Sequence, residues 1–490
     1  MIRPARPLET VMPQSSSICE SMPASLGLPP PGLPGMLAPT SIDRFELLQT
    51  PGLWGHDPAD NAYWQPADGP SPQMPAASRR LLEAIEDVIA SARTQVDISS
   101  LQSCASGAFA AALRRGIARA AAEATEPLRV RILYGYHGYT RPGFPDETEA
   151  DFDDFFRGLT ADLASDAKVR VEGCFMKTSL DAKHPSWNHS KIIAADGRRA
   201  IVGGHNLWHD DYLSFAPVHD VSALIEGQAA GDAHRFLDHL WQWTAERSAS
   251  HGKTAFCHTV CWAAGRISHE PASPPTPLPQ REPPGAIPAL ALGRLGVGVS
   301  DDAKLANVAA VVPAVLFAQA RSSIRLSQMD FGLMINGVNY WREDIIEALA
   351  TALTASDRSV DVSLVLSEVG AVVAVGGTYS FGTTYADVVA KLRSAIGDRP
   401  VTGRMRLAPL RCSERGERWQ YDGRDVLFAN HAKVWIVDDR LVHVGSDNIY
   451  PHALQEFSYL IDSEETARDV IARYWEPLWR YSSRGATDVC

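Results

Sequence analysis

Hydrophobic positions along the chain follow two periods, and each period predicts a different kind of element. Short apolar runs rich in β-branched side chains predict strands at 96–99, 128–134, 169–173, 324–327 and 360–366. Apolar positions three and four residues apart predict helices at 79–93, 105–124, 230–246, 310–321, 342–355 and 382–396. Because strands and helices alternate in both halves of the chain, we expect a layered α/β unit in each half.

The distribution of proline predicts the domain boundaries. Eight prolines fall between Pro271 and Pro288, a density typical of an extended, semi-rigid linker. The first 44 residues are rich in Pro, Ser and Met, and we expect them to be disordered. The resulting prediction is a tail at 1–44, an N-terminal domain at 45–267, a linker at 268–288 and a C-terminal domain at 289–490.

Membrane and targeting signals are not evident in the sequence. Proline interrupts the apolar stretch near the start, and no basic segment followed by an apolar helix is seen there. We therefore expect no cleavable signal peptide, and either a cytoplasmic location or export by another route. No run of about 18 apolar residues occurs, so we expect no transmembrane segment.

One motif occurs twice, about half the chain apart. Residues 189–206 read HSKIIAADGRRAIVGGHN, and residues 431–448 read HAKVWIVDDRLVHVGSDN. His, Lys, Asp, Gly and Asn recur at the same spacing, with an offset of 242 residues. Two full copies indicate an internally duplicated protein. We expect two such units related by a pseudo-twofold axis, with the motifs meeting at their interface.

The spacing within each copy fits a β-hairpin. Alternate side chains of a strand share one face, so His189 and Lys191 should point the same way, as should His431 and Lys433. A turn after each apolar run then brings the returning strand back to the His and Lys.

The remaining motif positions follow from that hairpin. Asn206 and Asn448 should lie beside the His and Lys, where they can contact the same substrate. At the ends of the returning strands, glycine would let the backbone approach a phosphate closely. The structural positions of the motif are Asp196 and Asp438 in the turns, and Gly203, Gly204, Gly445 and Ser446 at the strand ends.

Two imidazoles and two ammonium groups at one place suit the chemistry of a phosphodiester. One histidine can attack phosphorus while the other protonates the departing oxygen. The lysines and asparagines can hold the phosphoryl oxygens, so we expect no metal ion and no other cofactor at this site. The symmetry of the two copies leaves open which histidine is the nucleophile, and the two should titrate as a coupled pair.

Each half also places an acid directly before its next apolar strand. Asp220 precedes Val-Ser-Ala-Leu-Ile, and Glu456 precedes Phe-Ser-Tyr-Leu-Ile. A carboxylate on one imidazole nitrogen fixes the tautomer and raises the basicity of the other nitrogen. Their parallel placement favours a role beside the histidines over that of solvated acids at strand starts.

The paired motifs resemble those of the phospholipase D superfamily, the HKD enzymes, and most closely its secreted Streptomyces-type bacterial members. The likeness extends over residues 45–490 and includes further segments in the same order. Among them are LLQTPGLWG (47–55), GGHNLWHDDYL (203–213), GRLGVGV (293–299) and GSDNIYPHALQEFSYLID (445–462).

This resemblance implies a fold, an activity and a role for each residue of the site. The fold would be two duplicated α/β domains with one site between them. The activity would be hydrolysis of phosphatidylcholine-like lipids to phosphatidic acid at a membrane or micelle surface, with head-group exchange when an alcohol replaces water. His189 would form a phosphohistidine and His431 would act as acid and base, while Asp220 and Glu456 would pair with the two histidines.

Recognition of a choline head group would use aromatic faces. The candidates lie near motif segments or where the family carries aromatic residues, and they are Trp187, Trp208, Tyr212 and Tyr379. Tyr379 stands in GGTYSFG, which resembles a Gly-Gly-Tyr-Ser loop of the family. His205 departs from the family, which usually has an aliphatic residue there, and it either alters the pocket or packs in the core.

Charge separates the alternative functions. The chain has 46 basic and 58 acidic residues and a net charge of −12, which argues against nucleic acid as a partner. It therefore argues against a superfamily nuclease, since many of these are short, basic, single-motif dimers. Intact residues in both motifs argue against a non-catalytic scaffold. A lipase toxin delivered by a specialised secretion system stays open, and we expect a monomer because one chain carries both motifs.

The other cysteines and histidines show no metal-binding pattern in the sequence. The seven cysteines are scattered, and Cys257 and Cys261 are expected either to form a disulfide or to remain two thiols. The histidines outside the motifs occur singly, which is more typical of surface or core residues than of ligands.

Overall fold

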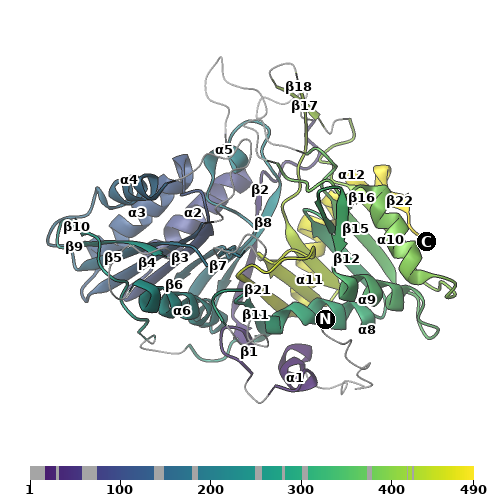
Figure 1. Cartoon of the computed structure of the whole chain (residues 1–490), viewed down its shortest axis with the longest axis horizontal. Helices are drawn as coiled ribbons and strands as arrows, with labels where there is room; N and C mark the ends of the chain where they lie inside the picture. Colours follow the sequence, from purple (N-terminus) through teal and green to yellow (C-terminus); the bar gives the residue numbers. More distant parts are fainter. Residues whose placement is uncertain are drawn as a thin grey trace.

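Two large sheets form the framework of the molecule. The computed structural model describes residues 17–28, 32–57, 74–136, 148–178, 186–248, 257–276, 278, 282–300, 307–371, 378–415, 418–421 and 424–490. Within these residues the chain forms two nine-stranded sheets and two small two-stranded sheets. The large sheets lie side by side, one built mainly by each half of the chain (Figure 1). This is the duplicated α/β fold that the alternating pattern predicts.

The N-terminal sheet has the strand order β10-β9-β5-β4-β3-β6-β7-β8-β2. Its strands are β2 (Arg44–Thr50), β3 (Gln95–Leu101), β4 (Leu128–Gly135), β5 (Val169–Met176), β6 (Ile192–Ala195), β7 (Arg199–Gly203), β8 (Asp220–Glu226), β9 (Cys257–Ala263) and β10 (Arg266–Ser268). The helices of this half are α2 (Ala76–Ala90), α3 (Gly107–Glu123), α4 (Glu149–Thr160), α5 (His209–Tyr212) and α6 (Ala229–Ser248). Strands β3, β4 and β5 pair in parallel, as the helices between them require.

The C-terminal sheet has the order β1-β11-β21-β20-β19-β12-β15-β16-β22. Its strands are β1 (Leu37–Ile42), β11 (Ile287–Arg294), β12 (Ser323–Gln328), β15 (Asp361–Leu366), β16 (Arg404–Pro409), β19 (Lys433–Val437), β20 (Leu441–Gly445), β21 (Glu456–Asp462) and β22 (Thr487–Asp488). The helices are α8 (Val312–Gln319), α9 (Glu343–Leu353), α10 (Tyr385–Ile396), α11 (Glu464–Val470) and α12 (Glu476–Ser482). Read from its other end, this order repeats that of the N-terminal sheet, with β6 matched by β19 and β8 by β21.

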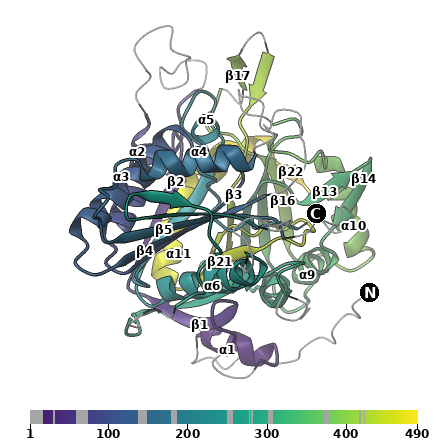
Figure 2. The same ribbon diagram turned by 60° about the vertical axis from the view of Figure 1, so that its left-hand side comes forward.

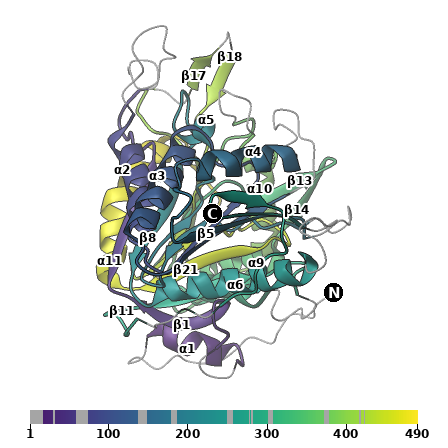
Figure 3. The ribbon, with the colours of Figure 1, turned by 90° about the vertical axis from the view of Figure 1, so that its left-hand side faces the viewer.

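Helices cover both faces of each sheet and create a core that the two halves share. Helices α2, α3 and α4 lie on one face of the N-terminal sheet, and α6 lies on the other (Figures 1 and 3). Helix α6 also reaches the C-terminal sheet, because the Phe236 ring lies 5.1 Å from Phe457 and the Tyr459 hydroxyl donates to the Ala229 carbonyl at 2.6 Å. The shared core fixes the two sheets relative to each other.

The N-terminal segment corrects the prediction of a disordered tail at 1–44, although residues 1–16 lie outside the described part. Helix α1 (Ile18–Ser25) buries Cys19 and Met22 completely, and the Ile18 amide donates to Asp462 at 2.8 Å. Strand β1 pairs antiparallel with β11, so α1 and β1 lie along the lower edge of the molecule (Figure 2). The prediction from composition was wrong because these apolar residues pack against residues far along the chain, and local sequence propensity does not show such contacts.

The proline-rich segment contacts the N-terminal sheet. The described residues between β10 and β11 form no helix or strand, and Arg129 donates to the carbonyls of Ser273 and Pro274 at 2.9 and 3.0 Å.

Cys257 and Cys261 remain thiols. Both lie on β9, four positions apart, which is about 13 Å along a strand and too far for a disulfide. No helix in the described part of the chain has the length and apolar character of a membrane span.

The ordered α1 makes a direct stability prediction. Replacing the fully buried Met22 with Ala should lower the free energy of unfolding by about 2 kcal/mol or more, because it leaves a cavity beneath α1. Urea unfolding monitored by fluorescence would measure the change. Glu20→Ala, an exposed position on the same helix, is the matched control and should change stability little. Equal stability of Met22→Ala and the wild type would mean that α1 does not dock.

Candidate active site

The two motifs form matching hairpins in the middle of the molecule. Lys191 directly precedes β6, and His189 lies two residues before this lysine; in the second copy Lys433 is the first residue of β19, and His431 lies two residues before it. Strand β6 pairs with β7 and β19 with β20, both antiparallel, which is the hairpin that the spacing predicts. All four residues are buried, with exposed fractions between 0 and 5 %.

Backbone pairing joins the two halves at these hairpins. Asn188, before the first histidine, forms a parallel bridge with Gln455, which precedes Glu456. The His189 amide donates to the Gln455 carbonyl at 2.8 Å, and the Gln455 amide donates to the Trp187 carbonyl at 3.1 Å. Each motif is therefore attached by backbone hydrogen bonds to the strand start of the other half.

The second copy repeats this pairing with the halves exchanged. Asn430 bridges His219, which precedes Asp220. The His431 amide donates to the His219 carbonyl at 2.7 Å, and the His219 amide donates to the Ala429 carbonyl at 2.9 Å. The two bridges obey the same pseudo-twofold relation as the sheets.

Each histidine consequently receives its carboxylate from the opposite half. His189 Nδ1 lies 2.8 and 3.0 Å from the two carboxylate oxygens of Glu456. His431 Nδ1 lies 2.7 Å from Asp220 Oδ2. A carboxylate on Nδ1 holds the proton there and leaves the lone pair on Nε2. The sequence places these acids beside the histidines, and the structure adds that the pairs cross the interface.

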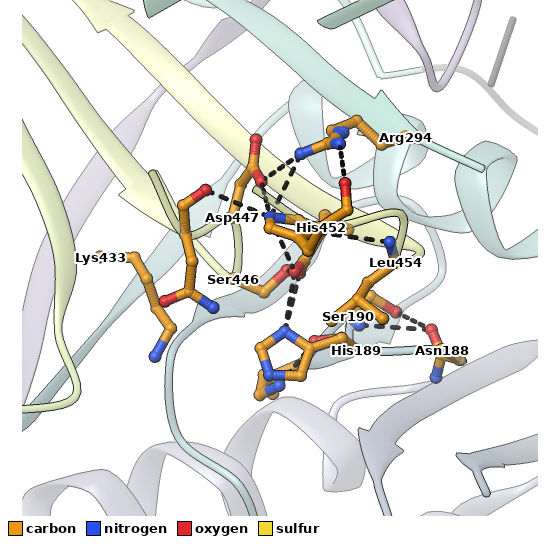
Figure 4. Close-up of polar contacts among 12 residues, drawn as sticks. Asn188, His189, Ser190, Arg294, Lys433, Ser446, Asp447, His452 and Leu454 are labelled. Carbon is orange, nitrogen blue, oxygen red and sulfur yellow. Dashed lines mark hydrogen bonds and ion pairs between the residues drawn. The ribbon is translucent and has the colours of Figure 1, made fainter. Parts of the chain in front are cut away.

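The two lysines turn back toward the histidines. Lys191 Nζ donates to the His189 carbonyl at 2.6 Å, and Lys433 Nζ donates to the His431 carbonyl. An ammonium group has three donors, so each lysine retains donors for a second acceptor. Figure 4 shows Lys433 and His189 on the same side of the site.

Burial and positive neighbours keep both imidazoles neutral. Burial lowers the pKa of His189 well below its ordinary value, and the charges of Lys191 and Lys433 lower it further. Burial and Lys433 lower the pKa of His431 to about 3, although Asp220 opposes the shift. Burial lowers the pKa of Lys433 to about 8, so its positive charge predominates at neutral pH, and burial lowers the pKa of Lys191 well below its ordinary value. The site therefore offers neutral nitrogen nucleophiles in a field that favours an anion.

The two acids differ in their surroundings. Burial alone would raise the pKa of Asp220, but His431, His205 and Lys433 hold it below the usual range. Burial and the nearby Asp447 carboxylate raise the pKa of Glu456 well above its usual value. The sequence symmetry of the two copies is thus broken by their electrostatics.

A series of polar contacts leads to Glu456 and has no equivalent beside Asp220. Arg294 Nη1 donates to Asp447 Oδ1 at 2.7 Å, and the same carboxylate oxygen lies 3.0 Å from His452 Nε2 (Figure 4). His452 Nε2 is 3.9 Å from Glu456 Oε1. Asp447, His452 and Glu456 are close enough to hold a metal ion, but the guanidinium of Arg294 already occupies Asp447 and would repel a cation.

The turn and glycine positions of the motif are structural. The Asp196 and Asp438 side chains accept backbone amides from 93–95 and 321–323, at the ends of the hairpins away from the histidines. A Cβ at Gly203 or Gly445 would lie 2.1 or 2.0 Å from the hydroxyl of Ser222 or Ser458. These glycines therefore permit close packing of adjacent strands, and the expected approach of their backbone to a phosphate stays a prediction. A Cβ at Gly204 would strike Asp220, and Ser446 donates to Glu456.

Asn206 and Asn448 lie in the site with unused hydrogen-bonding capacity. Asn448 Nδ2 contacts the Tyr450 hydroxyl at 2.9 Å. The side-chain oxygens of both asparagines are buried and have no hydrogen-bond partner among the described residues. Turning the Asn448 amide over would let its oxygen accept from Tyr450 and free its NH₂ group for an anionic oxygen.

The four aromatic candidates occupy different places. Tyr212 is completely buried, and its hydroxyl donates to Asp220 at 3.1 Å on the Nδ1 side of His431. The Tyr379 ring meets His431 edge-on at 5.1 Å, and its hydroxyl donates to Asp211. Trp208 is a core residue whose indole donates to the Ser103 carbonyl, while Trp187 is half-buried next to the first bridge.

Some residues of the site were missed in the sequence. Asn188 and Asn430 anchor the two histidines, with their amides donating to Ser99 and Ser327 hydroxyls at 2.9 and 3.1 Å. They obey the same 242-residue offset as the motif, which was the available signal. The support of Glu456 by Arg294 and Asp447 has no such signal, because its members do not recur in the other half.

In sequence, the chain resembles a known phospholipase D. No family model matches it. It is 31% identical to a phospholipase D from Streptomyces antibioticus over 499 aligned positions, covering 92% of this chain and 83% of the relative.

Solved structures also resemble the fold. A phosphatidylserine synthase from Haemophilus influenzae covers 84% of this chain and 85% of its own length, with a TM-score of 0.51 and 13% identity. At that identity the likeness concerns the fold alone. Nuc, a phospholipase D family member from Salmonella typhimurium, covers 36% of this chain and 88% of its own, with 22% identity and a TM-score of 0.23. That overlap is too weak to carry an argument.

His205 generates a prediction about pH and stability. Its two ring nitrogens contact Thr50 and Ser222 hydroxyls at 2.9 and 2.8 Å, so it packs in the core, and burial lowers its pKa to about 4. The unfolded state, with a pKa of about 6.5, binds more protons between these values, so stability falls as pH falls from about 6.5 to 4. Between pH 7 and pH 5 this group should cost the wild type about 2 kcal/mol.

Replacing His205 with Gln should remove that contribution. Urea unfolding at pH 7 and pH 5 should therefore show a smaller loss of stability on acidification in the variant than in the wild type. His239→Gln, at an exposed position on α6, is the control and should keep the wild-type dependence. An identical pH dependence in His205→Gln would show that His205 is not held neutral.

Proposed function

Because the chain belongs to the phospholipase D family, we propose that it is a phospholipase D. Its substrates are phosphatidylcholine-like lipids, which it hydrolyses to phosphatidic acid and a free head group. The observation that carries the proposal is the crossed pair of histidine–carboxylate contacts beside two buried lysines. That arrangement provides two neutral imidazoles with fixed tautomers in a positively charged pocket, as a phosphodiester requires.

In the proposed reaction, His189 Nε2 attacks phosphorus and the bond from phosphorus to the head-group oxygen breaks. His431 supplies the proton to that oxygen, and a phosphohistidine remains. Water or an alcohol then gives its proton to His431 and attacks the same phosphorus, which releases His189. The product is phosphatidic acid with water, or an exchanged lipid with an alcohol.

Protonation of His431 depends on the substrate. With its pKa lowered to about 3, the imidazole is neutral in the ligand-free site. The negative phosphodiester would raise that pKa by offsetting the charges of Lys191 and Lys433, which lower it. Binding and activation of the acid are then one electrostatic event, in which Asp220 supplies the permanent negative charge on the other ring nitrogen.

Electrostatics favour His189 over His431 as the nucleophile. Asp220 is held as an anion beside His431, which suits a residue that must carry a proton. Glu456, with its raised pKa, stabilises an imidazolium at His189 less strongly, so His189 stays neutral. The lysines and the two asparagine amides would hold the phosphoryl oxygens, and the chemistry requires no metal ion.

One chain supplies both histidines and both acids, so a monomer would suffice for activity. The net charge of −12 disfavours nucleic acid as the substrate. The lipid would be met at a membrane or micelle surface, and a toxin delivered by a specialised secretion system would use the same chemistry.

Head-group exchange gives the most direct test of the activity. Incubation with a panel of defined phospholipids and ethanol should yield both phosphatidic acid and phosphatidylethanol, measured by mass spectrometry. His189→Ala should lose about a hundredfold or more of the rate, because general acid–base assistance alone contributes about 10² to 10⁴. Cleavage of plasmid DNA without turnover of any lipid would contradict the proposal.

The crossed pairs predict different effects for the two acids. With a phosphatidyl ester of p-nitrophenol, departure of the leaving group needs no acid. Asp220→Asn should then weaken His431 and slow breakdown of the intermediate, giving a burst of nitrophenol and a trapped phosphohistidine. Glu456→Gln should weaken His189 and slow its formation, with no burst. Each substitution should cost about 10- to 100-fold in the affected step.

Rapid-quench measurement of nitrophenol and of acid-labile phosphoryl label would separate these steps. His189→Ala is the control and should carry no label. The reverse pattern, with a burst in Glu456→Gln and none in Asp220→Asn, would exchange the roles of the two histidines.

A further inference from the structure

A second group of histidines and carboxylates lies at the outer edge of the N-terminal sheet. Glu149 and Asp153 belong to the first turns of α4, His258 lies on β9, and His269 directly follows β10. In the strand order, β5, β4 and β3 separate β9 from β6, the strand of the first motif. The group is therefore remote from the proposed catalytic site.

Three potential metal-binding side chains converge in this group. His258 Nε2 lies 2.7 Å from Asp153 Oδ1, and His269 Nε2 lies 3.6 Å from Asp153 Oδ2. One ligand atom from each of the three residues falls within 4.8 Å of the others. Tetrahedral zinc with bonds of about 2.0–2.2 Å separates neighbouring ligand atoms by about 3.3 Å, so small side-chain movements would close the site.

The second nitrogen of His269 is hydrogen-bonded as in many metal-binding histidines, and that of His258 faces a carboxylate at longer range. His269 Nδ1 contacts the Thr259 carbonyl at 3.1 Å. A carbonyl can only accept, so the proton is on Nδ1 and the lone pair of Nε2 faces Asp153. His258 Nδ1 is buried, has no hydrogen-bond partner among the described residues, and lies 4.0 Å from Glu149 Oε2. Ligating histidines commonly donate their other N–H to a carbonyl or a carboxylate.

We propose that Asp153, His258 and His269 bind a zinc ion that fastens α4 to the β9–β10 hairpin. Two imidazoles and a carboxylate are ligands that suit zinc, and a water molecule would complete the tetrahedron. On binding, the Nε2 proton of His258 is released to solvent or passes to Nδ1, where Glu149 can accept its hydrogen bond. Zinc therefore replaces the hydrogen bond between His258 and Asp153.

Access and local charge agree with this assignment. The side chain of His269 is 48% exposed and that of Asp153 20% exposed, so an ion can enter from solvent. His258 is 4% exposed and provides the rigid wall of the site. In the described part of the chain no lysine or arginine pairs with Asp153, His258 or His269, in contrast to Asp447, which Arg294 binds. Lys177 pairs with the supporting Glu149 at 3.5 Å.

The experiment uses the full-length protein without a histidine tag, stripped with EDTA and dialysed against zinc. Metal analysis should find one zinc per chain, and zinc should raise the Tm of the wild type. Glu149→Gln removes only a supporting contact and should weaken zinc binding about 10- to 100-fold. His269→Ala removes the most exposed ligand and should weaken zinc binding by more than that. Both variants should lose the Tm increase to a corresponding degree.

Control variants separate this site from the other histidines. His239→Ala and His452→Ala should keep the zinc, and phosphodiester turnover by His269→Ala at 25 °C should equal that of the wild type. Cobalt in place of zinc should give the intense visible absorption of a four-coordinate ion in the wild type and not in His269→Ala. Zinc retained at full affinity by His269→Ala, or lost from His452→Ala, would overturn the proposal, as would a wild type that binds no zinc.

Discussion

Two parallel backbone bridges between the halves determine the geometry of the whole site. They place the residue before each histidine against the residue before the acid of the other half, so the histidine and acid that follow must meet. All four side chains are buried, and leaving a buried polar group without its hydrogen-bond partner costs about 1–3 kcal/mol, more when the group is charged. The geometry of the proposed catalytic site therefore depends on these few hydrogen bonds, in addition to the shared core that fixes the two sheets.

The duplication accounts for the architecture, and the departures from it bear on the proposed chemistry. The strand orders of the two sheets match, and the histidines, lysines and anchoring asparagines occupy equivalent places. A covalent mechanism needs two histidines that behave differently. Asp447 lies beside Glu456, which makes its environment unlike that of Asp220. A few substitutions in one copy thus make the surroundings of the two histidines different, although the fold makes their positions equivalent.

The motif spacing predicted the hairpins, and the duplication predicted that the two His/Lys sets meet. The alternating pattern also located α2, α3, α6, α9 and α10 to within a few residues. It could not show which acid belongs to which histidine, because a repeat specifies equivalent positions and not contacts between copies. It also failed for β1, whose partner β11 is remote in sequence, and it could not show that Gly203 and Gly445 pack against the adjacent strand. Contacts of this kind exist only after the chain has folded.

The pairing of β1 with β11 has a consequence for biosynthesis. Leu37 is made early, but its partner Leu292 leaves the ribosome only after more than half of the chain is complete. Elongation at about 5–20 residues per second makes that delay on the order of tens of seconds. Glu456 emerges later still, and until it docks His189 has no carboxylate. Under the proposed mechanism, a nascent or truncated chain that lacks Glu456 should therefore be at least about 10- to 100-fold slower than the complete chain.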